Sequence, residues 1–269
     1  MPCCGMPRHH LAGLAALCIA SPALAQVKPF PTDFKVRDIT TNGTTIHVRV
    51  GGHGPAVTLL HGFGDTGDMW APLAAVLEAN HTVVVPDLRG MGLSSHPADG
   101  YDKKTEAADI AGVLDSLKID QTSIVAHDIG NMVGFAFTAR YPQRVSRLVL
   151  IDAPVPGIAN WDELKCDPRL WHFNFYGPDA RPGGMHSALS QFHAFPQDAK
   201  DNQASLAQGK LSTPVMAIGG SGSFGTVMAT VASAAFTTVD GRVIADAGHW
   251  IMEEQPAAVI AVVRPFLDQ

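Results

Sequence analysis

The chain has 269 residues, enough for one α/β domain with a substantial core. Its formal charge is −6, with 19 Lys and Arg against 25 Asp and Glu, and this acidic balance disfavours nucleic acid or an anionic membrane as a partner. The 12 histidines do not fall into metal-ligand spacings, so we expect no metal and no cofactor.

The first 25 residues have the pattern of a secretory signal peptide. A basic or polar start around Arg8 is followed by an apolar stretch at 11–20 and a small-residue site that ends at Ala25. The stretch is too short for a membrane span, which needs about 20 apolar residues. We expect cleavage after Ala25, a secreted or periplasmic protein with a charge of −7 because only Arg8 is lost, and Cys166 as its single cysteine.

Strand and helix patterns alternate along the rest of the chain. Residues 34–39 and 45–50 resemble an antiparallel hairpin that turns at Asn42-Gly43. Further strands are predicted at 57–60, 82–85, 123–125, 145–151, 215–218 and 242–245, and helices at 69–79, 103–117, 131–141 and 256–267. This alternation predicts an α/β fold with a mainly parallel sheet flanked by helices on both faces.

Residues 155–211 interrupt the alternation between two sheet strands and are rich in Pro, Gly, His and aromatic residues. We interpret them as a cap on an α/β core formed by 26–154 and 212–269. His172 and Tyr176 could line a pocket beneath it, because residues four apart share a helix face. Both could equally be packing aromatics.

Asp128 stands where a strand would turn sharply into a helix. Ala126 and Gly130 place small side chains two residues before and after it, as a nucleophile elbow requires because strand and helix approach closely there. A serine would suggest an esterase, whereas a carboxylate attacks saturated carbon and gives an alkyl ester that water must hydrolyse. Epoxides and alkyl halides suit that chemistry. The alternative is that Asp128 only caps the next helix.

His249 lies after the run at 242–245 and before the last predicted helix, where a nucleophile–acid–base chain order places the base. Its ordinary pKa of about 6.5 suits activation of water near neutral pH. The loop after strand 215–218 contains no acid. We therefore assign the orienting carboxylate to Asp152, directly after strand 145–151, with Asp246 as the alternative.

An oxyanion hole is predicted after strand 57–60. The glycines of His61-Gly62-Phe63-Gly64 let backbone N–H groups turn toward a substrate oxygen. We expect the amides of Phe63 and Ile129 to stabilise the tetrahedral intermediate formed when water attacks the Asp128 ester.

Together these motifs resemble the epoxide hydrolase branch of the α/β-hydrolases, specifically the secreted Cif-type enzymes. They are HGFG at 61–64, PDLRGMG at 86–92, AHDIGNMVG at 126–134, LIDAPVPG at 150–157, WHF at 171–173 and AGHW at 247–250. The resemblance implies an α/β-hydrolase fold with a cap, and hydrolysis of an epoxide to a diol. It also implies Asp128 as nucleophile, His249 as base, Asp152 as acid, and His172 with a cap tyrosine at the epoxide oxygen.

The cap departs from this family pattern. Tyr176 is its one tyrosine, and Gln191 and Phe192 stand where another would be expected. The cap is also short, as though a piece were missing between 176–178 and 181–184. His172, with Tyr176 or His193, would then have to act on the epoxide oxygen.

Other functions fit the sequence less well. Haloalkane dehalogenases usually have a tryptophan after the nucleophile, where this chain has Ile129, and fluoroacetate-type dehalogenases need arginines that Ile129 and Asn131 do not supply. Ser221 and Ser223 do not stand in a complete small-x-Ser-x-small elbow, which disfavours a serine esterase. A secreted binding protein that lost turnover with its cap remains an alternative. The expected partner is a small-molecule substrate, and a homodimer is left open.

Overall fold

The computed structural model describes residues 29–170 and 186–269. One eight-stranded sheet runs through it in the order β1-β2-β4-β3-β5-β6-β7-β8. The strands are β1 Lys35–Thr41, β2 Thr44–Gly52, β3 Ala56–Leu60, β4 Thr82–Pro86, β5 Thr122–His127, β6 Val145–Ile151, β7 Val215–Gly220 and β8 Val239–Ile244. The β1–β2 and β2–β4 pairs are antiparallel and the others are parallel, which confirms the predicted hairpin and α/β sheet.

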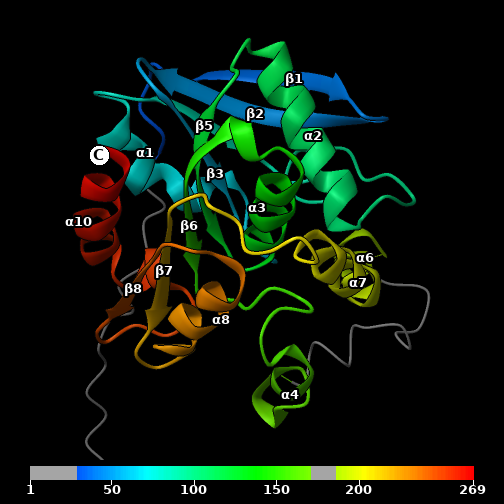
Figure 1. Cartoon of the computed structure of the whole chain (residues 1–269). Coiled ribbons are helices and arrows are strands. Elements are labelled where there is room, and N and C mark those ends of the chain that lie inside the picture. The colour runs from blue at the N-terminus through cyan, green and yellow to red at the C-terminus, as the bar shows by residue number, and fades with distance from the viewer. Residues whose placement is uncertain (1–28, 171–185) are drawn as a thin grey trace, which may run out of the picture.

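Helices cover both faces of the sheet, with α1 and α10 on one side and α2 and α3 on the other (Figure 1). The helices of the core are η1 Gly67–Trp70, α1 Ala71–Leu77, α2 Lys103–Ser116, α3 Ile129–Arg140, η2 Pro142–Arg144, α8 Val227–Ala235, α9 Ile251–Glu254 and α10 Pro256–Leu267. The helix predicted at 69–79 is divided, because Pro72 lies in the first turn of α1, where the ring is tolerated. Helix α8, which connects the parallel strands β7 and β8, was not predicted.

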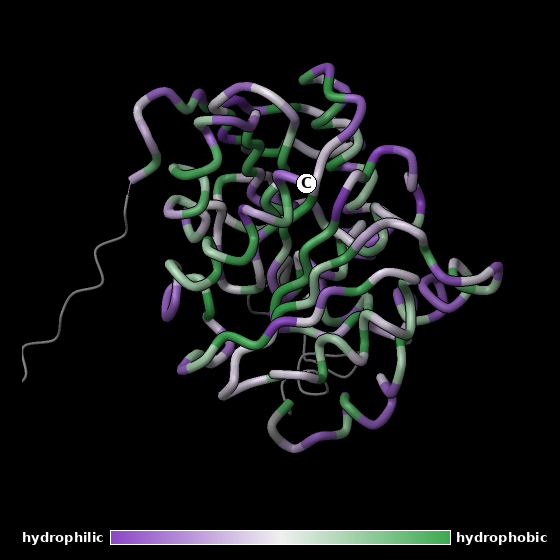
Figure 2. Tube along the Cα trace, turned by 60° about the vertical axis from the view of Figure 1, so that its left-hand side comes forward, coloured by the Kyte–Doolittle hydropathy of each residue, from purple (hydrophilic) through white to green (hydrophobic). Residues whose placement is uncertain are grey.

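The central strand β5 is buried along its whole length. Ile124 and Ala126 pack into the core beneath α2, α3 and α8, whereas Val125 packs into the core beneath α1 and α10. Successive side chains of a strand point to opposite faces, so a sheet covered on both sides buries every position of its central strand. Figure 2 shows hydrophobic segments gathered in the middle of the molecule and hydrophilic ones on its outer loops.

Between β6 and β7 the chain leaves the sheet. Its described helices there are α4 Trp161–Leu164, η3 Pro168–Leu170, α6 His186–His193 and α7 Phe195–Ser205. Helix α4 lies beyond the carboxyl end of β6 (Figure 1). The predicted signal peptide, His172 and Tyr176 lie outside the described residues, and the division into core and cap stays a prediction. Within 29–170 and 186–269, no helix is long and apolar enough to cross a membrane.

Candidate active site

Asp128 occupies the turn between β5 and α3. Its backbone has φ 51° and ψ −120°, a strained conformation for a residue with a side chain. Strand and helix approach so closely that a Cβ at Gly130 would lie 2.4 Å from the carbonyl oxygen of Leu60. This is the geometry of a nucleophile elbow, and it presents Asp128 at the carboxyl edge of the sheet.

The backbone amide of Phe63 donates to Oδ1 of Asp128 over 2.8 Å. Phe63 follows β3, which is the parallel neighbour of β5, so its loop meets the elbow at the same sheet edge. Ile129 is the first residue of α3, and its N–H therefore has no partner inside the helix. The two predicted oxyanion-hole amides thus belong to segments that meet at Asp128, and the Phe63 amide already binds its carboxylate.

His249 lies between two carboxylates. Its Nδ1 atom is 2.9 Å from Oδ2 of Asp152, and its Nε2 atom is 3.5 Å from Oδ2 of Asp128. Asp152 is fully buried, and the amides of Gly220 and Phe224 donate to its Oδ1 over 2.8 and 3.3 Å. The alternative acid, Asp246, is exposed. The structure therefore brings together the three residues selected from the sequence.

A buried asparagine connects the elbow to the strand that precedes Asp152. The Asn131 side chain donates to the carbonyls of Ile151 and Ala153, each over 2.9 Å, and accepts from the Ile151 amide over 3.0 Å. These bonds fix the start of α3 against the end of β6. In the sequence Asn131 stood out only as a position without an arginine, and this structural role was not predicted.

The carboxylates and the imidazole of the site shift one another's pKa values toward the charged forms. Burial alone would raise the pKa of Asp128, but its contact with His249 and the Phe63 amide hold that pKa well below its ordinary value. Burial alone would lower the pKa of His249, but Asp128 and Asp152 raise it to about 10. The resting site is therefore an aspartate–imidazolium–aspartate arrangement at neutral pH.

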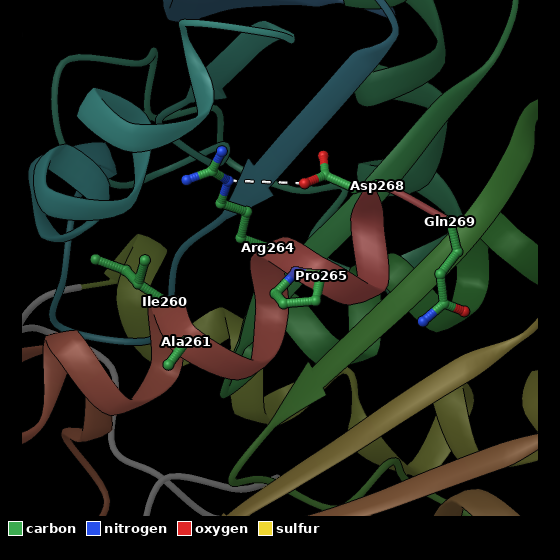
Figure 3. Close-up of a pocket in the computed structure, with 6 residues that line it drawn as sticks. All are labelled: Ile260, Ala261, Arg264, Pro265, Asp268 and Gln269. Carbon is green, nitrogen blue, oxygen red and sulfur yellow. Dashed lines mark ion pairs between the residues drawn. The ribbon is translucent and has the colours of Figure 1, made fainter.

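A cavity of about 320 Å³ opens beside Asp128 and His249. Its wall is mostly apolar and comes from the loop after β6, from α4 and η3, and from the loop between β7 and α8; it is formed by Ala153, Leu164, Asp167, Leu170, Gly222, Ser223, Phe224 and Val227. A second hollow, drawn in Figure 3, lies on α10 beside the Arg264–Asp268 ion pair and contains none of the site residues. Only the first hollow combines a buried carboxylate with an imidazole.

The positions expected to hold a family tyrosine have other contacts. Gln191 is buried and accepts from Nζ of Lys103 over 2.7 Å, whereas the Phe192 ring packs edge-on against Phe63 at 4.8 Å between centroids. His193, proposed as a substitute, is exposed on α6. Neither Gln191 nor Phe192 supplies a phenol to the site.

Two further polar residues lie behind the base and were missed. His127 precedes Asp128 and its Nε2 atom is 2.9 Å from the carbonyl oxygen of His249, while Asp65 faces the other side of the His127 ring. The sequence shows a histidine directly before the candidate nucleophile, but nothing in it indicates what that ring contacts. In the described residues no group of three or more His, Cys, Asp or Glu side chains could hold a metal ion.

Residues 55–177 match the family described as "alpha/beta hydrolase fold". A soluble epoxide hydrolase from Corynebacterium sp. (strain C12) is 27% identical, with 84% of this chain and 94% of that one covered. The crystal structure of Cfl2 from Burkholderia cenocepacia has a TM-score of 0.80 and 30% identity, with 87% and 96% covered. The chain belongs to the α/β-hydrolases.

Within that family the chain is similar to proteins named epoxide hydrolases, the Corynebacterium enzyme among them. A fluoroacetate dehalogenase from a Burkholderia species is also similar, 33% identical over 149 residues, which are 53% of this chain and 49% of that enzyme. The match thus spans about half the length of that dehalogenase. The identity over this shared half does not distinguish epoxide from halide chemistry, so the choice depends on the site.

Proposed function

We propose that this α/β-hydrolase opens epoxides to diols through a covalent ester on Asp128. The observation that carries the proposal is that the two carboxylate oxygens of Asp128 have different contacts. The Phe63 amide binds Oδ1, whereas Oδ2 is the oxygen that faces Nε2 of His249. Oδ2 is therefore the nucleophile, and Oδ1 is placed to become the oxyanion when water attacks the ester.

Protons balance over the proposed cycle. Attack by ionised Asp128 breaks one C–O bond of the epoxide and forms an ester and an alkoxide, which needs one proton. Esterification removes the Asp128 charge that raises the pKa of His249, so the imidazolium becomes more acidic and can lose that proton to the alkoxide. We propose that His172 and Tyr176 deliver this proton to the epoxide oxygen. The family resemblance implies their place at that oxygen.

Neutral His249 then acts as the base of the second step. It takes a proton from water, the hydroxide adds to the ester carbon, and the amides of Phe63 and Ile129 stabilise the charge on Oδ1. Collapse of the intermediate breaks the bond to Oδ2, releases the diol and restores ionised Asp128 beside protonated His249. Asp152 keeps the His249 ring oriented through both steps.

Intact mass spectrometry with an epoxide panel in oxygen-18 water tests the proposal. We expect His249→Gln to accumulate an adduct on Asp128, because the ester forms but no base activates water. The wild type should release diol, and Asp128→Asn should form no adduct. After several turnovers in oxygen-18 water, the label should also appear in Asp128 itself, because water attacks the ester carbonyl.

Two alternatives give different results. A haloalkane dehalogenase would form the same adduct with alkyl halides and none with epoxides. A binding protein without turnover would form an adduct with neither class. Because a fluoroacetate dehalogenase is similar to this chain, alkyl halides are included among the test substrates. Ile129 and Asn131 nevertheless supply no arginine that could bind the carboxylate of a fluoroacetate-type substrate.

We also propose that the enzyme is exported and begins after Ala25. The basis is the apolar stretch at 11–20 followed by small residues at 23 and 25. Expression of the full chain with fractionation and N-terminal sequencing tests this. A protein that starts at Gln26 outside the cytoplasm is expected, and an uncleaved chain retained inside would contradict export.

A further inference from the structure

The ring of His127 is fully buried behind the catalytic base. Its Nε2 atom is 2.9 Å from the backbone carbonyl oxygen of His249. A carbonyl can only accept, so Nε2 carries the proton and donates it. In a neutral ring the other nitrogen, Nδ1, is then an acceptor.

Nδ1 faces a second acceptor. The Oδ2 atom of Asp65 lies 3.8 Å from it, and among the described residues neither atom has a hydrogen-bond partner. Two lone pairs that face each other in a buried place repel, and each buried polar atom left unpaired destabilises the folded state. One proton between them removes both penalties.

Several charged groups act on this pair. The ionisable groups that act on Asp65 are Glu253 at the end of α9, Asp128 in the elbow and His249. Burial, Glu253 and Asp128 raise the pKa of Asp65 to about 7, and His249 opposes them. Burial and the neighbouring His249 lower the pKa of His127 to about 4, while Asp128 and Asp152 oppose this. The shared proton therefore resides on the carboxyl group.

We infer that Asp65 and His127 form a proton-sharing pair that positions the catalytic base through the backbone carbonyl of His249. The O–H of protonated Asp65 faces Nδ1 across 3.8 Å, and its attraction for the Nδ1 lone pair keeps the proton of His127 on Nε2, where it holds the loop that carries His249. Neither residue touches substrate in this role. The inference depends on the proposed function only for its activity measurement.

Ionisation of Asp65 reverses the arrangement. A carboxylate accepts from Nδ1–H, so the neutral ring changes tautomer and turns a bare Nε2 lone pair toward the His249 carbonyl. His127 then no longer fixes the position of His249, and a small misplacement of a catalytic group lowers the reaction rate. Activity should fall as the pH rises through about 7, although His249 itself keeps its proton up to about 10 in the resting enzyme.

The decisive measurement is the tautomer of His127 in the ¹⁵N-labelled full chain, from long-range ¹H–¹⁵N spectra at about pH 5.5 and about pH 8.5. The His127→Gln variant assigns the signals. We expect the wild type to change from Nε2–H to Nδ1–H. Asp65→Asn, whose amide donates at any pH, should keep Nε2–H throughout, while Asp68→Asn, exposed three residues further along in η1, should behave like the wild type.

Activity gives the second readout. The wild type and Asp68→Asn should lose about threefold to tenfold in kcat on the alkaline side, and Asp65→Asn should lack that decline. The same tautomer at both pH values in the wild type would overturn the inference, as would an alkaline decline retained by Asp65→Asn. Since the spectra need no turnover, a protein that changes tautomer without hydrolysing epoxides would refute the proposed function alone.

Discussion

Nε2 of His249 lies 3.5 Å from Oδ2 of Asp128, the carboxylate oxygen that the Phe63 amide does not bind. The proposed base and the proposed nucleophile therefore stabilise each other in their resting charge states. This contact makes the basicity of His249 depend on whether Asp128 is free or esterified. The base is available only after the first step of the proposed cycle has occurred.

Asp128→Asn imitates the loss of charge on esterification. We expect the pKa of His249 to fall clearly below about 10, because removal of a carboxylate within a few ångströms destabilises the imidazolium. The histidine signals in an NMR titration measure this. A pKa that stays at about 10 would mean that Asp152 alone sets the basicity of His249, and the proposed activation of the base would be wrong.

Asp152→Asn tests the orienting acid. The amide keeps the size of the side chain but removes its charge and allows the wrong tautomer of His249, so kcat should fall by about 10²–10⁴-fold. Ester hydrolysis should suffer more than ester formation, and the adduct on Asp128 should accumulate. Asp246→Asn is the matched control, since that aspartate is exposed near the same histidine. Equal losses in both variants would contradict the assignment.

Glycine substitutions in one helix test the elbow. Gly130→Ala would place a Cβ 2.4 Å from a backbone carbonyl, so we expect a loss of about 1–3 kcal/mol or more in the free energy of unfolding. Gly134→Ala, one turn further along α3, meets only side-chain carbons at 3.4–3.5 Å and should be neutral or stabilising by up to about 1 kcal/mol. Urea unfolding midpoints measure both, and equal values would show that the elbow can relax.

A buried cation ties α2 to the helices between β6 and β7. Nζ of Lys103 donates to Glu106 and Gln191, and its backbone amide donates to Asp198. Lys103→Met leaves the two carboxylates buried without a cation, so we expect a loss of about 3–5 kcal/mol in stability. Lys104→Met breaks a partly exposed pair with Asp201 and should cost less than about 1 kcal/mol. Thermal or urea unfolding distinguishes them, and a small effect at Lys103 would disprove the buried-network argument.

The core of the fold was predictable because its strands and helices carry the simplest signals. Val145–Ile151 and Pro256–Leu267 have the predicted bounds, since a fully buried strand and a proline-initiated helix are both marked locally. Helix α8 was missed because it follows a glycine- and serine-rich loop, although Thr226 stands at its N-cap. The need to connect two parallel strands also indicates a helix here.

The site was predictable to the extent that chain order fixes it. Asp128, Asp152 and His249 each follow a strand, and parallel strands bring their carboxyl ends to one sheet edge. Contacts between residues of different loops were not predictable in this way. The bond from His127 to the His249 carbonyl and the approach of Asp65 join three separate loops, and no local pattern in the sequence encodes such meetings.

Three aspartates adopt a left-handed backbone directly after a strand or near its end. Asp128, Asp152 and Asp246 have φ values of 51°, 52° and 52° and follow β5, β6 and β8. Such a conformation costs a residue with a side chain about 1–2 kcal/mol, whereas glycine adopts it freely. Glycine would relieve the backbone strain at all three positions, but at Asp128 and Asp152 it would also leave backbone amides without their carboxylate acceptor and remove a residue of the proposed triad. Asp246→Gly is therefore the substitution that should raise heat resistance while turnover is kept.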